Sequence, residues 1–114
     1  MNANRDAIVM ELVNYGSMIV QYHKRPVSHG GGGNNFTTAY DKAYLGMVLG
    51  WTAAEATAGV ATTENGTFYL TTAAGVVTIV GVGTEKGNDG AGGVQATNTI
   101  TLANRNPNSV VINN

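Results

Sequence analysis

The stretch DAIVMELVNYGSMIVQYHKRP, residues 6–26, sets the architecture of this chain. Within it, apolar and aromatic side chains recur at alternating intervals of four and three residues. These intervals place them on one face of an α-helix. The stripe consists of Ile8, Leu12, Tyr15, Ile19 and Tyr22. We therefore predict one helix over about residues 3–25, held to the rest of the domain by these five side chains.

Both ends of this helix carry matching signals. Asn4 is predicted to be the N-cap, and Asp6 lies in the first turn, where negative charge is favourable. His23 to Arg25 occupy the last turn, and we interpret His23 as a helix-end cation. Pro26 then ends the helix, because the residue before a proline avoids the helical conformation.

The apolar sector of the helix is wider than one sheet face requires. Val9, Val13 and Val20 broaden the stripe, and Met10 and Met18 lie toward its flanks. Two interpretations stay open. The extra surface is either core in a small domain or a surface that packs on a neighbouring subunit.

The second half of the chain is predicted to be β-structure, as a meander over residues 66–112. Strands are expected at 66–72, 76–84, 94–102 and 109–112, with a short hairpin loop at 73–75. From Val94 to Leu102, residues of one face alternate with glutamine and threonine. This alternation indicates one buried face and one face in water. The predicted fold class is α+β, with the N-terminal helix packed on three or four antiparallel strands.

Two segments lie between these halves of a single domain spanning residues 1–114. The glycine-rich loop 28–37, with Gly30–Gly33, is expected to be a connection, because no strand precedes it and no Lys-Ser/Thr pair follows it. The mixed region 38–63 favours a short helix over 39–49, with a strand in 45–51 as the alternative. Trp51 is either a core residue or a ligand platform.

Composition excludes several classes of function. The net charge is −1, only 11% of residues are charged, and there are no cysteines. A nucleic-acid binder would show a basic face, and thiolate metal sites need cysteine. His23 and His29 lack further ligands nearby in sequence, and the seven acids are scattered. The loop 87–93 is interpreted as a turn. We therefore expect no cofactor, no metal and no enzyme activity.

Three elements together resemble the type IV pilin-like proteins of bacteria. They are Asn4-Arg5-Asp6-Ala7, the helix end Tyr22-His23-Lys24-Arg25-Pro26, and Ser28 followed by Gly30–Gly33. The likeness is closest over residues 3–37 and weaker through residues 65–69. It implies a long N-terminal helix on an antiparallel sheet and a hydrophobic segment upstream of this chain. Unlike pilins with a C-terminal disulfide loop, this chain has no cysteine.

The resemblance also implies a function. The protein would be a structural subunit of an extracellular filament, a pilin or pseudopilin, anchored in the inner membrane before assembly. Its partners would be other copies of itself. Residues 1–114 would be monomeric and outside the membrane. Arg5, Asp6 and Glu11 either pair between subunits or are merely solvated.

The alternative function is ligand binding. In this hypothesis a small surface β-domain binds carbohydrate or another ligand through a stacking platform of Trp51, Tyr40, Tyr44 and Tyr69. It requires Trp51 to be exposed to solvent. The third hypothesis, an enzyme, requires a polar pocket of which the sequence gives no sign.

Overall fold

The computed structural model describes residues 3–26, 28, 31, 33, 39–86, 93–103 and 107–113. The rest of the predicted glycine-rich loop, His29 included, lies outside the described residues. So do residues 87–92, which form most of the predicted turn after the second long strand.

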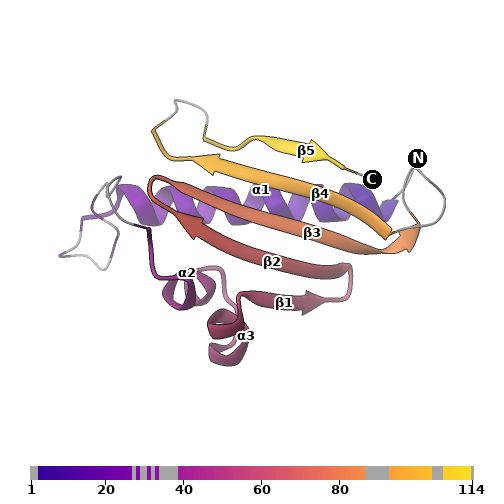
Figure 1. Ribbon diagram of the computed structural model, residues 1–114, viewed down its shortest axis with the longest axis horizontal. Helices are drawn as coiled ribbons and strands as arrows, with labels where there is room; N and C mark the ends of the chain where they lie inside the picture. Colours follow the sequence, from indigo (N-terminus) through magenta and orange to yellow (C-terminus); the bar gives the residue numbers. More distant parts are fainter. Residues whose placement is uncertain are drawn as a thin grey trace.

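The chain forms three helices and five strands within the described residues. In chain order they are α1 (Ala3–Lys24), α2 (Lys42–Val48), α3 (Ala53–Ala58), β1 (Val60–Thr63), β2 (Gly66–Ala73), β3 (Val76–Lys86), β4 (Gly93–Thr101) and β5 (Val110–Ile112). The strands form one antiparallel sheet in the order β1-β2-β3-β4-β5 (Figure 1). The predicted α+β fold, an N-terminal helix on an antiparallel sheet, is confirmed.

The sheet has a strand, β1, that the predicted three or four strands did not include. It follows Gly59, whose left-handed φ of 72° ends α3 and turns the chain back along β2. The turn Glu64-Asn65 then joins β1 to β2, with Thr63 opposite Gly66. Only Ala61 of its four residues is buried, so no alternation of apolar residues marked it in the sequence.

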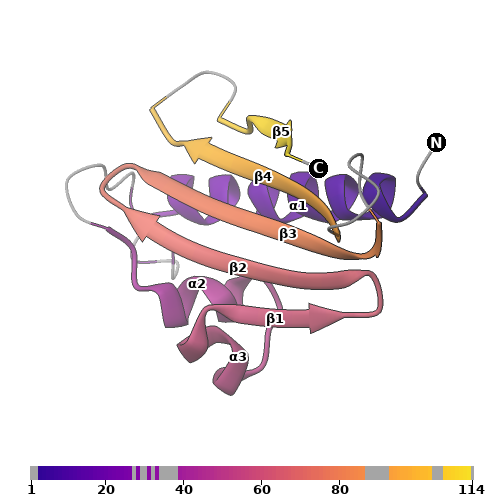
Figure 2. The same ribbon diagram turned by 45° about the vertical axis from the view of Figure 1, so that its right-hand side comes forward.

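The helices cover one face of the sheet and leave the other open. Helix α1 runs along the strands over β3 and β4, and α2 lies beside it near β2 (Figures 1 and 2). The predicted alternation in β4 is confirmed on the covered side, where Val94, Ala96, Asn98 and Ile100 are all buried. On the open side Gln95 is exposed and the threonines of β4 are half-buried.

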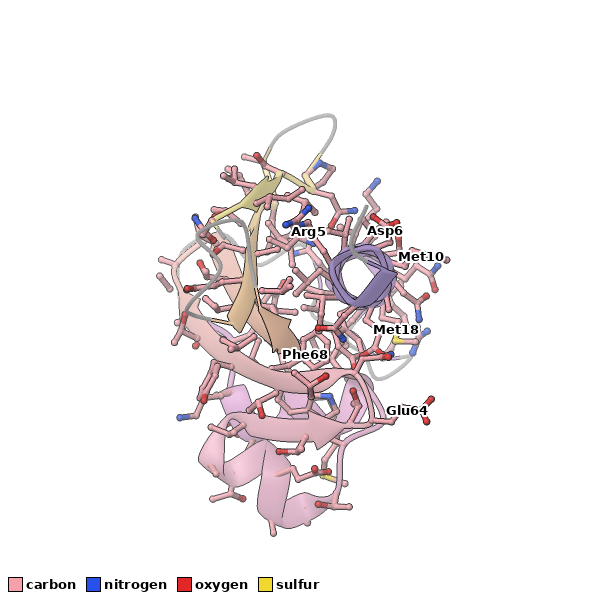
Figure 3. All side chains as sticks on the ribbon, turned by 90° about the vertical axis from the view of Figure 1, so that its right-hand side faces the viewer. Arg5, Asp6, Met10, Met18, Glu64 and Phe68 are labelled. Carbon is pink, nitrogen blue, oxygen red and sulfur yellow. The ribbon has the colours of Figure 1, made fainter. Side chains whose placement is uncertain are left out.

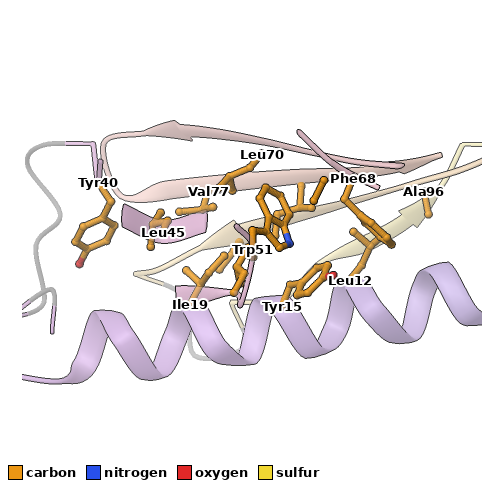
Figure 4. Close-up of a cluster of buried hydrophobic side chains, with 14 of the residues drawn as sticks. Leu12, Tyr15, Ile19, Tyr40, Leu45, Trp51, Phe68, Leu70, Val77 and Ala96 are labelled. Carbon is orange, nitrogen blue, oxygen red and sulfur yellow. The ribbon is translucent and has the colours of Figure 1, made fainter. Parts of the chain in front are cut away.

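The core lies between α1, α2 and the sheet. Tyr15 is its centre, with its ring edge-to-face against Phe68 at 5.3 Å and against Trp51 at 6.0 Å between ring centroids (Figure 4). Leu45 and Leu49 bring the second helix into the same cluster. Trp51 is therefore a core residue, which is one of the two interpretations that the sequence left open.

The two short helices carry strong local signals. Asp41 caps α2 by accepting a hydrogen bond from the Ala43 N–H at 3.1 Å. This helix confirms the predicted short helix in 39–49 and rules out the strand there. Thr52 and Glu55 form a reciprocal capping box at the start of α3, at 3.1 and 3.2 Å. The Ala/Thr-rich stretch that forms α3 is a helix that the sequence did not predict.

The predicted N-cap of α1 is wrong, because Asn4 lies inside the helix. Its amide group instead reaches the sheet. The Nδ2 donates to the Asn65 carbonyl at 2.8 Å, and the Oδ1 accepts from the Thr84 N–H at 3.0 Å. The side chain thus joins α1 to the β1–β2 turn and to β3.

Glycines allow α1 to lie close to the sheet. A Cβ on Gly81 would come within 2.7 Å of the Ile8 side chain, and one on Gly83 within 2.1 Å of the Asn4 Oδ1. Both glycines lie on the covered face of β3. Because no side chain stands there, the N-terminal half of α1 packs against the backbone of this strand.

A buried asparagine completes the contact between α1 and the sheet. Asn98 of β4 donates through Nδ2 to the Leu12 carbonyl at 2.8 Å and to the Asn108 Oδ1 at 3.0 Å. Its Oδ1 accepts from the Ser109 N–H at 3.1 Å. Its amide atoms therefore link the helix backbone, β4 and the entrance to β5, which offsets the cost of burying a polar side chain.

This contact predicts the effect of the substitution Gly16→Ala. At an exposed helical site this change stabilises by roughly 0.5–1 kcal/mol. Here the added methyl group would lie 1.7 Å from the Asn108 Oδ1 and 2.7 Å from the Asn98 Nδ2. We expect the free energy of unfolding in urea to fall by about 1–3 kcal/mol.

The matched control is Asn14→Ala, at an exposed position of the same helix. It should leave the free energy of unfolding unchanged or raise it slightly. Equal effects of the two substitutions would contradict the packing described for Gly16.

Candidate functional site

The sheet-facing side of α1 contains the residues that the sequence assigned to packing. Ile8, Leu12, Tyr15 and Ile19 are buried in the core cluster, and Tyr22 is partly buried against it. Burial also raises the pKa of both tyrosines above the ordinary value of 10.0. These side chains hold the helix in place and leave its remaining surface as the candidate site.

The opposite side of α1 exposes apolar side chains to solvent. Met10 is 72% exposed and Val13 is 42% exposed. Figure 3 looks along the helix and shows Met10 pointing away from the sheet, with Asp6 beside it. Ser17 and Gln21 continue the same side toward the C-terminal end without adding a charge. We call this surface, defined by Asp6, Met10, Val13, Ser17 and Gln21, the outer face of α1.

The three charged residues predicted as possible subunit contacts have different surroundings. Asp6 is exposed on the outer face of α1. Arg5 is half-buried and lies on the side of the helix that faces the sheet (Figure 3). Glu11 accepts hydrogen bonds within the chain, from the Asn65 Nδ2 at 2.6 Å and from the Tyr15 hydroxyl at 3.4 Å. Of the three side chains, only that of Asp6 is thus exposed to solvent.

Titratable side chains of the described residues form no obvious reaction centre. No group of three His, Asp or Glu side chains among them is placed to hold a metal ion. Asp6, Asp41 and Glu64 are exposed at separate places on α1, before α2 and in the β1–β2 turn. No described helix combines the length and the apolar character needed to cross a bilayer.

The carbohydrate platform of the alternative hypothesis is not assembled. Trp51 is 8% exposed and Tyr40 is also buried. Tyr44 and Tyr69 are exposed, but they lie on α2 and on the open side of β2. Tyr44 instead packs against Tyr22, with 5.5 Å between ring centroids.

The interpretation of His23 as a helix-end cation is wrong. Its side chain is 1% exposed, and its Nδ1 shares a hydrogen bond with the Tyr40 hydroxyl. The Tyr40 ring packs edge-on against both His23 and Tyr22. Burial lowers the pKa of His23 below its ordinary value of 6.5, and the positive charge of Lys24 lowers it further. The helical position alone gave no signal for this, because the ring is covered by a segment that is distant in sequence.

Comparisons of the chain with protein-family models, with curated proteins and with solved structures gave no significant match. The candidate site therefore rests on the geometry of α1 and on the sequence elements that surround it.

The burial of His23 predicts a pH dependence of stability. The unfolded chain takes up a proton at His23 near pH 6.5, whereas the folded chain resists protonation until a lower pH. The free energy of unfolding should therefore fall as the pH drops below about 6.5, and this group should contribute no change above about pH 7. Urea titrations between pH 5 and 8 measure it.

The control for this prediction is His23→Gln, which cannot titrate but can still hydrogen-bond. The variant should show a flatter profile between pH 5 and 7, whatever its absolute stability. An unchanged slope would assign the pH dependence to another group.

The burial of Trp51 predicts a fluorescence signature. Because Trp51 is the only tryptophan, its emission reports its surroundings directly. We expect a blue-shifted emission maximum and weak quenching by iodide in the folded protein, and a red-shifted, readily quenched emission in urea. A red-shifted emission that iodide quenches readily in the folded protein would support the hypothesis of a stacking platform instead.

Proposed function

We propose that this chain is the head domain of a structural subunit of a type IV pilin-like filament at the bacterial cell surface. In this role it has no catalytic activity and binds no cofactor. Its partners are other copies of itself, and the intact subunit is anchored in the inner membrane before assembly. The head alone is monomeric and lies outside the membrane.

The observation that carries this proposal is the two-sided use of α1. One side of the helix is buried along the sheet, and the outer face of α1 displays Met10 and Val13. Exposed apolar side chains on one helix face are typical of a protein interface. A helix in the head thus retains apolar surface that its own sheet does not use.

A contact between two different surfaces of the head would favour a filament. The outer face of α1 and the open side of the sheet are different surfaces on opposite sides of the molecule (Figures 1 and 3). A contact between two different surfaces of identical subunits generates open, helical assemblies unless the rotation closes a ring. The residues that carry the resemblance, Asn4–Ala7 and Tyr22–Pro26, lie in this helix and directly after its last residue, Lys24. In the proposed subunit a hydrophobic segment precedes residue 1.

The proposal is tested first on the native protein from its own cells, by intact mass and N-terminal sequencing. The expected result is a mature chain that begins some way upstream of residue 1 with a hydrophobic, helix-forming segment. A native chain that starts at residue 1, with no such segment, would overturn the proposal.

A second test places a charge on the outer face of α1 in the full-length subunit. Met10→Lys should reduce the number of surface filaments at least about tenfold, because a buried charge at an interface without a partner is strongly unfavourable. Ala58→Lys, at an exposed position on α3 and on neither of these two surfaces, is the matched control. Electron microscopy counts the filaments, and thermal unfolding of each head shows that the fold is kept.

A further inference from the structure

The two edges of the sheet are protected to different degrees. At the β1 edge, α3 packs directly against the strand. The Glu55 carboxylate of this helix accepts a hydrogen bond from the Thr62 N–H at 3.4 Å. That N–H points away from β2. The Leu70 N–H donates to the Gly59 carbonyl, so the backbone groups of Gly59 face β2. Because the direction alternates along an antiparallel strand, those of Thr62 face outward. A helix and a carboxylate thus close this edge.

The β5 edge has no such cover among the described residues. The Asn113 N–H donates to the Gln95 carbonyl at 2.8 Å, and the Thr99 N–H donates to the Ser109 carbonyl at 3.1 Å. In an antiparallel ladder the backbone groups of successive residues face alternately toward and away from the partner strand, so those of Ser109, Val111 and Asn113 face β4. The N–H and C=O groups of Val110 and Ile112 therefore face outward, away from β4.

The side chains of β5 itself are all apolar. Val111, opposite Thr97, is 55% exposed on the open side of the sheet. Ile112, opposite Ala96, is 49% exposed on the side of α1. Residues 107–113 include no charged side chain, and edge strands are usually blunted by charges. Along residues 107–113 a second β5 would therefore meet hydrogen-bonding groups and apolar surface without electrostatic repulsion.

We propose that β5 is a self-pairing edge whose partner is β5 of a second copy of this chain. The two strands run antiparallel about a twofold axis at Val111. Each copy then donates the Val110 and Ile112 N–H groups and accepts at the carbonyls of the same residues. Val111 of each copy meets its counterpart on the open side of the joined sheet. This surface and its occupant are independent of the filament contact at α1.

The closed β1 edge determines the form of this assembly. Pairing of β5 with β1 of another copy would be repeated without limit and would give fibres. Glu55 and α3 obstruct that pairing, so the open edge is left with its own counterpart. Pairing of β5 with β5 is isologous and ends at a dimer.

The length of β5 determines the strength of the contact. A strand of three residues buries far less than the roughly 1,200–2,000 Å² of a stable interface. The dimer is therefore weak, with a dissociation constant on the order of 1 mM, and the head is monomeric at micromolar concentration.

The experiment compares two substitutions at one residue. Ile112→Pro removes the outward N–H, and proline is tolerated where an edge strand faces solvent. Ile112→Thr also removes the isoleucine side chain but keeps the N–H. Amide hydrogen exchange and chemical shifts are recorded by NMR from about 0.05 to 2 mM, a range that spans the expected dissociation constant. Thermal unfolding confirms that each variant is folded.

In the unsubstituted chain the Val110 and Ile112 amides should exchange more slowly, and shift, as concentration rises. The dissociation constant should rise at least about tenfold for Ile112→Pro and much less for Ile112→Thr. The proposal is overturned by any of three results: no concentration dependence at β5, changes centred on α1 or on α2, or equal weakening by both substitutions. The series on the unsubstituted chain decides the question even if the proline variant fails to fold.

Discussion

The contact of Asn98 with the backbone of α1 constrains how α1, β4 and β5 are placed relative to one another. Its amide binds the Leu12 carbonyl, the Asn108 side chain and the Ser109 N–H, so one buried residue links the helix, β4 and the start of β5. The link requires close approach, and Gly16 provides the space for it. If the helix moved outward, the buried amide would lose the Leu12 carbonyl as an acceptor, and an unsatisfied buried polar group costs more than the hydrogen bond contributes when it is formed.

The attachment of α1 to the sheet determines which of its side chains reach the surface of the molecule. Because one side of α1 is held against the sheet by Ile8, Leu12 and Ile19, the direction of the remaining helix surface is fixed. Met10 and Val13 must face solvent or a neighbouring molecule. The same attachment holds β5 at the edge of the sheet, with its outward backbone groups on the opposite border from α3. The fold therefore presents two separate surfaces, one helical and one at a strand edge.

The helix and the long strands could be predicted from the sequence because their signals are local. The interval of four and three residues from Ile8 to Tyr22, and the alternation from Val94 to Leu102, each report one buried face. Strand β1 gave no such signal, since it has four residues of which one is fully buried. The outer face of α1 could be anticipated only as one of two interpretations, because a valine at the flank of a stripe packs equally well in a core or at an interface.

The fold class, the extent of α1 and the inward face of β4 follow from the amino-acid order alone, because periodic burial along a single element needs no knowledge of its partners. The roles of Asn4, His23 and Asn98 emerge only when the chain is folded. Each is polar and occupies an ordinary helical or strand position, and its partner is distant in sequence: Asn65 and Thr84, Tyr40, and Leu12 respectively. Such a side chain can cap a helix, carry a charge or link two elements by hydrogen bonds. Which of these it does depends on the groups that the fold brings within hydrogen-bonding distance.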